Sequence, residues 1–249
     1  TTGHGSAVNE INPASFQPVE PFFGSAPPIV SPAQFHESGF SSAHLRGGDY
    51  LGYWLPSSMP VLINDSLNSG ANFVYSYYDG LDKVGHIHGI NDFYDAEVRF
   101  IDDLVGKILA CVPNGTALIV TADHGLVDVD DSLVTLETAA TDLATALSGE
   151  ARFLWFHSKR GAEAELVEIL EQLYSQNGWI RTRDQVLDEG WFGKQVSTIA
   201  NSRLGDVALV ARNPVAFVPA GKEGPKLKAR HGSLTPAESY VPLMTMLKA

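Results

Sequence analysis

The sequence predicts an α/β fold: a mostly parallel central sheet flanked by helices, with a smaller α+β cap inserted into it. Two apolar, β-branched runs, Phe73–Tyr78 and Thr116–Thr121, predict strands. Between them, apolar residues recur at helical spacing from Val98 to Ile108. Continuous apolar strands separated by an amphipathic helix are typical of a parallel sheet covered by helices.

The segments on either side of this β-α-β unit are less regular. Residues 1–34 are rich in Gly, Pro, Ser and Asn, which predicts an extended loop. Trp54 to Leu67 has the pattern of a helix, and Asn91 or Asp92 can cap the helix that follows. After Pro236 the apolar end of the chain predicts a final helix.

The pattern changes after Asp130, and residues 131–225 are predicted to form the inserted cap. The main α/β domain then consists of residues 1–130 and 226–249. Within the cap we predict a helix near 132–147, a strand Arg152–His157, an amphipathic helix Glu163–Gln176 that Gly178 ends, and strands Val207–Ala211 and Val215–Val218.

Composition limits the function. The 249 residues carry a net charge of −12, and no basic stripe is visible, which argues against a nucleic-acid polymer as partner. No apolar run is long enough to cross a bilayer, so no membrane partner is expected. The single cysteine, Cys111, excludes an internal disulfide framework and favours a reducing, cytoplasmic location.

Two short strings follow the predicted strands. Asp82-Lys-Val-Gly-His86 comes after the first strand and Asp123-His124-Gly125 directly after the second. Ligand sites of open parallel sheets form at the carboxyl ends of strands, and Gly125 would allow a sharp turn there. A tight loop, or one face of a helix, would bring Asp82 and His86 onto one ion. Taken alone, each string is equally consistent with a polar loop or an Asp-His pair that closes a turn.

His231, in the segment Arg230-His-Gly-Ser, adds a third imidazole. As a single histidine it would be assigned to an exposed loop. Together the three strings supply two carboxylates and three imidazoles, which is most of the ligand set of a two-metal hydrolytic site. The joint pattern predicts a metal site where each string alone does not.

These strings, in this order, resemble the alkaline phosphatase superfamily, and within it the type I phosphodiesterase/nucleotide pyrophosphatase branch. The resemblance runs from about Phe16 to Leu247 and includes bacterial alkaline-phosphatase-family proteins. The segments that carry it are Leu45-Arg-Gly-Gly-Asp49, Val120-Thr-Ala-Asp-His-Gly125, Gly190-Trp-Phe-Gly193 and His231-Gly-Ser-Leu-Thr-Pro236.

The resemblance implies two divalent metal ions. Asp82, His86 and His231 would hold one ion. Asp123 and His124 would hold the other, together with an aspartate and a nucleophilic threonine nearer the N-terminus. Zinc suits these ligand types, with manganese as the alternative. The implied chemistry is in-line attack by the threonine on phosphorus through a phospho-threonine intermediate.

The chain departs from the family at its beginning, where the family has a first strand, a metal-binding aspartate and the threonine. Thr1-Thr2-Gly3-His4-Gly5 resembles a compressed form of the segment that follows these parts. We therefore expect the nucleophile upstream; Thr2 could serve only if the sequence joins separate pieces. A sheet without its first strand has an unpaired edge, so we expect low stability or a separate N-terminal fragment as partner.

The prediction is a hydrolase of phosphodiester or pyrophosphate bonds in a small, phosphorylated, nucleotide-like substrate. A phosphomonoesterase or phosphonate hydrolase of the same superfamily is one alternative, and a catalytically silent metal-binding module is another. The sequence does not determine the substrate or the oligomeric state.

Overall fold

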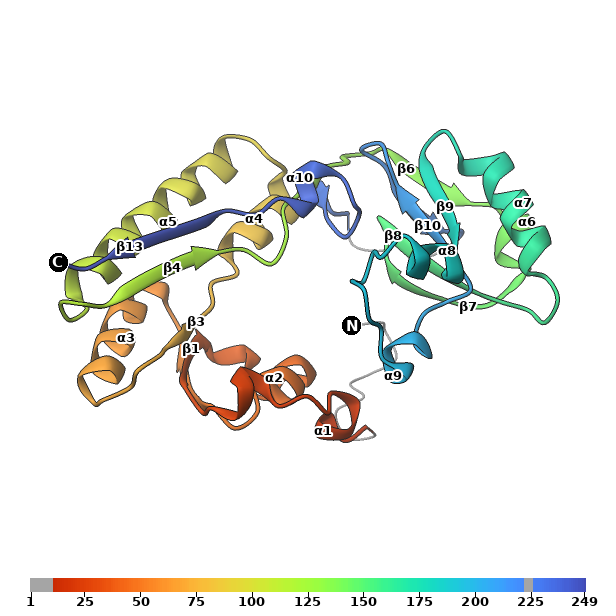
Figure 1. Ribbon diagram of the computed structural model, residues 1–249. Coiled ribbons are helices and arrows are strands. Elements are labelled where there is room, and N and C mark those ends of the chain that lie inside the picture. Colours follow the sequence, from red (N-terminus) through yellow and green to blue (C-terminus); the bar gives the residue numbers. More distant parts are fainter. Residues whose placement is uncertain (1–10, 222–225) are drawn as a thin grey trace. The chain divides into compact units, whose positions relative to one another are not determined.

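The computed structural model describes residues 11–221 and 226–249 (Figure 1). Contacts divide the chain into two compact units. Unit 1 runs to Leu81 and adds Ala96–Val120 and Met244–Ala249, whereas unit 2 consists of Asp82–Asp95 and Thr121–Leu243. None of the helices in the described ranges is long and apolar enough to span a membrane.

Unit 1 contains a three-stranded parallel sheet with the order β2-β1-β3. Its central strand is β1 (Pro28–Pro32), between β2 (Asp49–Tyr53) and β3 (Tyr75–Ser76). The extended loop predicted for residues 1–34 is therefore wrong at β1. Prolines at both ends concealed a strand whose central residues are fully buried.

Two helices cover this sheet as the sequence predicts. Residues of α3 (Met59–Asn68) and α5 (Asp92–Cys111) form a common core with Val30 of β1 and Tyr53 of β2. Their apolar positions recur every three or four residues, which gives each helix one buried stripe. The shorter helices of unit 1 are α1 (Pro13–Phe16), η2 (Pro21–Gly24), η3 (Ala33–Phe35), α2 (Gly39–His44) and η4 (Pro56–Ser58).

A second, two-stranded sheet pairs β4 (Ala117–Thr121) with β13 (Leu243–Leu247). The final helix predicted after Pro236 is wrong, because only a short helix forms there and the chain then pairs with β4 as a strand. β4 is a strand as predicted, but it is not buried: its alternate residues, Ile119 among them, are exposed.

Unit 2 is built on a four-stranded antiparallel sheet with the order β7-β8-β10-β9. The helix predicted near 132–147 is wrong, because this stretch forms two strands that pair with neighbours, separated by one helical turn. Pairing overrides the helix preference of its Ala and Leu residues. The elements are β6 (Leu133–Leu136), α6 (Thr138–Thr141), β7 (Ala144–Glu150), β8 (Phe153–Ser158), α7 (Glu163–Tyr174), β9 (Gly178–Thr182), α8 (Arg183–Asp188), α9 (Thr198–Asn201), β10 (Val207–Ala211) and β11 (Ala216–Pro219).

The two faces of this sheet form separate cores because side chains alternate along a strand. On β8, Leu154 and Phe156 pack into one core with α7, while Trp155 packs into the other with Val186 of α8. All five residues of β10 are buried. The predicted α/β class is thus confirmed, with an α+β arrangement in the region predicted as the cap, although Gly178 begins a strand rather than ending the preceding helix.

Candidate metal centre

Asp82 and His86 lie on α4 (Gly80–His88) rather than in the tight loop that we expected first. The helical alternative holds: four residues apart, they share one face, with His86 Nε2 3.2 Å from Asp82 Oδ1. Between them, Gly85 is buried, and a Cβ there would clash with the side chain of Leu126. Gly85 therefore lets α4 approach the segment that follows His124.

His124 and His231 are brought together by a short antiparallel ladder. β5 (Val127–Asp128) pairs with β12 (Ala229–Arg230), so that the turn before β5 and the loop after β12 are neighbours. The two imidazole rings stack with centroids 3.6 Å apart. One ligand atom each from Asp82, His124 and His231 lies within 4.8 Å of the others.

Asp82 Oδ1 is the common point of this cluster. It is buried and makes no hydrogen bond of good geometry with the described residues. His86 Nε2 lies 3.2 Å from it and His231 Nε2 3.9 Å. Ligands around a tetrahedral zinc stand about 3.3 Å apart. The spacing and the buried oxygen therefore fit a cation bound between carboxylate and imidazoles.

The tautomer of His86 is the one that a metal ligand needs. Its Nδ1 lies 2.8 Å from the carbonyl oxygen of Ala229, which can only accept, so Nδ1 carries the proton. In the neutral ring, Nε2 then presents a lone pair to the carboxylate of Asp82. A second proton or a metal ion must stand between two such acceptors. A backbone carbonyl that fixes the tautomer in this way is typical of metal-binding histidines.

The pKa directions follow from these contacts. Burial raises the pKa of Asp82, but the imidazoles of His86, His231 and His124 together lower it below its usual value. The carboxylate of Asp82 raises the pKa of His86, against the effect of burial. Burial, and next His124, lower the pKa of His231. Asp82 is thus ionised and His231 neutral near pH 7, the forms that bind metal ions.

The predicted residues do not all lie equally deep. The Asp123 side chain is 69% exposed, and its Oδ1 is 3.7 Å from His124 Nε2. His124 Nδ1 faces the carbonyl of Gly125 at 2.9 Å, so Nε2 is the nitrogen available to a ligand. Asp82, His86, His124 and His231 therefore gather closely, with Asp123 at the margin. Thr2, the alternative nucleophile, lies outside the described residues.

Sequence reasoning missed the groups behind these loops. Glu238, in α10 (Pro236–Ser239), is 2% exposed and accepts the Gly125 N–H with its main-chain oxygen at 2.8 Å. A Cβ on Gly125 would lie 2.0 Å from the carbonyl oxygen of Ala237, while its φ is not in the left-handed region. Gly125 is thus required for close packing rather than for a sharp turn. Thr235 and Glu238 have the spacing of a capping box, the one local signal available.

Comparison with known proteins places the fold. A search of the curated proteins gave no significant match. Among solved structures, murine ectonucleotide pyrophosphatase/phosphodiesterase 5 superposes with a TM-score of 0.69 at 17% identity, covering 88% of this chain and 60% of that one. Phosphonoacetate hydrolase from Sinorhizobium meliloti, in complex with phosphonoformate, gives 0.58 at 12% identity, covering 89% and 65%. Identities this low show a shared fold, and the chain spans about three fifths of the first relative's length.

A sequence comparison extends this result beyond the fold. The family model of type I phosphodiesterase/nucleotide pyrophosphatase matches residues 30–234, which include most of both units and all five numbered residues predicted as metal ligands. The resemblance inferred from the three strings is thereby confirmed, together with the alkaline-phosphatase-like fold. The chain belongs to the type I phosphodiesterase/nucleotide pyrophosphatase family.

Proposed function

We propose that this chain belongs to a metal-dependent hydrolase that cleaves phosphodiester or pyrophosphate bonds in small nucleotide-like substrates. The main support is the convergence of Asp82, His86, His124 and His231 within unit 2, in a chain of this family. The four residues come from one helix and two separate loops, so local sequence alone does not explain their proximity.

A bound cation would offset the repulsion between this acidic chain and a phosphorylated substrate. The net charge of −12 repels a phosphorylated substrate, and a bound divalent ion reverses the local field. Such an ion polarises a phosphoryl oxygen and lowers the pKa of an attacking hydroxyl group. Asp82, His86 and His231 would hold one ion, and Asp123 and His124 a second, with zinc favoured by the nitrogen and oxygen donors and manganese the alternative.

The chain's own groups prepare this site for binding. The Ala229 carbonyl fixes the tautomer of His86 and directs Nε2 towards Asp82. Burial keeps His231 neutral, so its nitrogen does not have to lose a proton before binding. The attacking group remains the threonine that the family resemblance implies. A small substrate, rather than a nucleic-acid polymer, fits the acidic composition.

Phosphonate hydrolysis is the second candidate. The phosphonoacetate hydrolase structure aligns over 89% of this chain, as extensively as the pyrophosphatase/phosphodiesterase structure does. The two substrate classes share a tetrahedral phosphorus centre and differ in the bond that breaks. The arrangement of ligands alone therefore does not separate them, and a substrate comparison is needed.

The first test compares a bis-aryl phosphodiester, the matching aryl monoester and phosphonoacetate as substrates. The chain and the full encoded protein would each be assayed with zinc, with manganese and with chelator. We expect metal-dependent cleavage of the diester above the other two. Faster cleavage of phosphonoacetate would favour the second candidate. Stoichiometric metal binding with no hydrolysis in either form would identify a silent binding module.

Variants connect this activity to the cluster. Asp82→Asn removes the charge on which three imidazoles converge, and we expect loss of activity. Zinc affinity should fall by more than about 10-fold, since groups that merely orient ligands already contribute 10- to 100-fold. Asp188→Asn, on an exposed position of α8, is the matched control. Equal zinc affinity of the two variants, measured by calorimetry, would contradict the assignment.

A further inference from the structure

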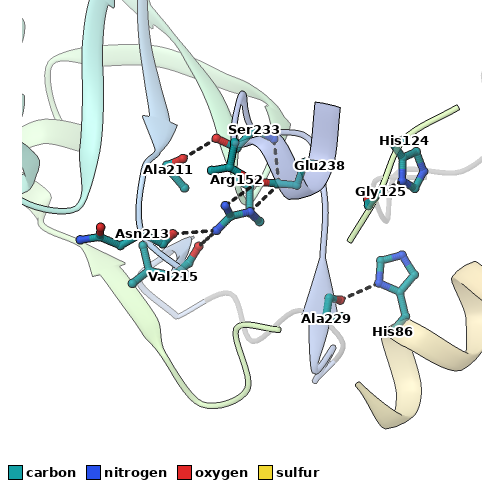
Figure 2. A network of polar contacts seen from close by, with 11 residues as sticks. His86, His124, Gly125, Arg152, Ala211, Asn213, Val215, Ala229, Ser233 and Glu238 are labelled. Atoms are coloured by element: carbon teal, nitrogen blue, oxygen red, sulfur yellow. Dashed lines mark hydrogen bonds and ion pairs between the residues drawn. The ribbon is translucent and has the colours of Figure 1, made fainter. Parts of the chain in front are cut away.

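We propose that the buried pair Arg152–Glu238 is a positioning element that fixes His124 and His231 relative to each other, and thereby sets the metal affinity of the site. The proposal rests on the proposed function for the role of these histidines. Neither Arg152 nor Glu238 belongs to the predicted ligand set. Both lie in unit 2 with the cluster (Figure 2).

Arg152 is fully buried in the turn between β7 and β8, and each of its three side-chain nitrogens donates at least one hydrogen bond. Its Nε and Nη2 donate to the two carboxylate oxygens of Glu238, each at 2.6 Å. Its Nη1 donates to the carbonyl oxygens of Asn213, at 3.0 Å, and Val215, at 2.7 Å. This arginine therefore ties α10 to the loop between β10 and β11, with the planar geometry that a guanidinium imposes.

Glu238 connects this pair to the His231 loop. Its Oε1 also accepts the Ser233 N–H at 3.0 Å, and its Oε2 accepts the Thr235 hydroxyl. The Ser233 hydroxyl in turn donates to the carbonyl of Ala211 at the end of β10. Only Gly232, with φ of 113°, separates Ser233 from His231. The His231 loop is thus held at Ser233, two residues after the histidine, through both the backbone N–H and the side-chain hydroxyl of Ser233.

The same residue holds the His124 turn through its backbone. The Glu238 carbonyl accepts the Gly125 N–H at 2.8 Å, and the adjoining Ala237 carbonyl leaves no room for a side chain on Gly125. Figure 2 shows Gly125 and His124 beside α10, with Glu238 turned towards Arg152 on its other side. One glutamate therefore contacts both segments that carry the stacked imidazoles.

Stability alone does not account for such a pair. A buried ion pair loses much of its attraction to desolvation, and well-packed apolar replacements are often equally stable. An apolar pair cannot accept the hydrogen bonds that the Ser233 N–H and the Thr235 hydroxyl donate to the Glu238 carboxylate. A role in positioning therefore predicts that apolar replacement preserves folding and impairs metal binding, whereas a purely structural role predicts no such separation.

The test is the double variant Arg152→Met/Glu238→Leu, with Arg181→Met/Glu189→Leu as matched control. The control pair is also an Arg–Glu contact in unit 2, at 2.7 Å, but it is exposed and touches no predicted ligand loop. We expect zinc affinity to fall 10- to 100-fold in the first variant and to change less than about two-fold in the control. Both metal-free variants should still unfold cooperatively, which would show that they fold. Unchanged zinc affinity in the first variant overturns the proposal.

A second measurement tests the proposal even if the double variant misfolds or the chain binds no zinc. Glu238→Gln keeps the shape of the side chain but replaces one acceptor oxygen by an amide NH₂ group, which cannot accept hydrogen bonds from Arg152, Ser233 or Thr235. The ring-proton NMR resonances of His124 and His231 report their stacking in the metal-free protein, and we expect them to shift in Glu238→Gln. Wild-type resonances in that variant would refute the positioning role. A wild-type chain that binds no zinc would refute the proposed function instead, and the resonances would still decide the role of Glu238.

Discussion

The four-stranded sheet of unit 2 and the two-stranded sheet of unit 1 have similar apolar sequences and differ in what covers them. Phe156 and Leu209, in the first sheet, are fully buried between strands and helix α7. In the second, Ile119 is 61% exposed and Leu247 72%. Burying one such side chain is worth about 1.5–3 kcal/mol. The first sheet therefore already gains the free energy that its sequence offers, and the second gains little of it.

The largest expected effect comes from removing a buried ring in the covered sheet. Phe156→Ala leaves a cavity at a fully buried core position, and we expect a loss of about 3–5 kcal/mol in the free energy of unfolding. Urea titration followed by tryptophan fluorescence suits this variant, because Trp155, Trp179 and Trp191 all belong to unit 2.

The control is Ile119→Ala in the exposed sheet, for which we expect a change within about 0.5 kcal/mol. Circular dichroism would follow its unfolding, since most of the tryptophan signal comes from the other unit. A loss as large as that of Phe156→Ala would mean that β4 is buried in solution, and it would contradict the difference in burial between the two sheets.

A smaller effect is expected from Gly125→Ala. The added methyl group would meet the Ala237 carbonyl oxygen, so the His124 turn or α10 must move. Overpacking of this kind costs about 1–3 kcal/mol, and zinc affinity should fall as well. Gly106→Ala is the control: this position in α5 has open space around it, and alanine there should stabilise by about 0.5–1 kcal/mol. The same sign for both variants would contradict the close packing.

What the sequence could predict of the fold depended on local periodicity. The strand Val207–Ala211 and the helices α5 and α7 were predictable, because their burial repeats within a few residues. β1 was not, since two prolines and a serine leave too short a pattern and its pairing partners lie far along the chain. β13 has the composition of a helix, and only its pairing with β4 makes it a strand.

The site divides in the same way. Asp82, His86, Asp123 and His124 could be predicted as ligands because each belongs to a short string with its own spacing, and His231 was added because of those strings. The structure brings Asp82, His86, His124 and His231 close together and leaves Asp123 exposed. Arg152 and Glu238 are 86 residues apart and form one contact, which no local pattern encodes. Directional pairing between distant buried charges is a property of the folded chain, so the groups that hold the ligand loops stayed hidden.

The acid stability of unit 2 is expected to depend on Glu238. Burial raises the pKa of its carboxyl, but hydrogen bonds from Arg152, Thr235 and Ser233 lower the pKa by more than burial raises it. The pKa of Glu238 is therefore below its ordinary value of 4.5. The ionised form therefore stabilises the folded state at neutral pH, and this contribution is lost as pH falls from about 4.5 through the folded-state pKa. Thermal midpoints between pH 7 and pH 3 should fall more steeply in the wild type than in Arg152→Met/Glu238→Leu. Parallel curves would show that the carboxylate is not held as described.

The smallest change in stability is expected where the exposed sheet meets solvent. Replacing Ile119 and Leu247 together by threonine places a β-branched residue, which favours strands, at both positions while removing apolar surface from water. The free energy of unfolding should change by about 0.5 kcal/mol or less, because neither side chain has much burial to lose. Self-association, measured by sedimentation velocity over a range of concentrations, should nevertheless decrease, since exposed apolar patches and strand edges promote contacts between chains. The matched variant Val98→Thr removes an exposed apolar side chain from helix α5, where no strand edge is available. If it lowers self-association as much as the double variant does, general hydrophobicity is responsible; if only the strand variant does so, the uncovered sheet is.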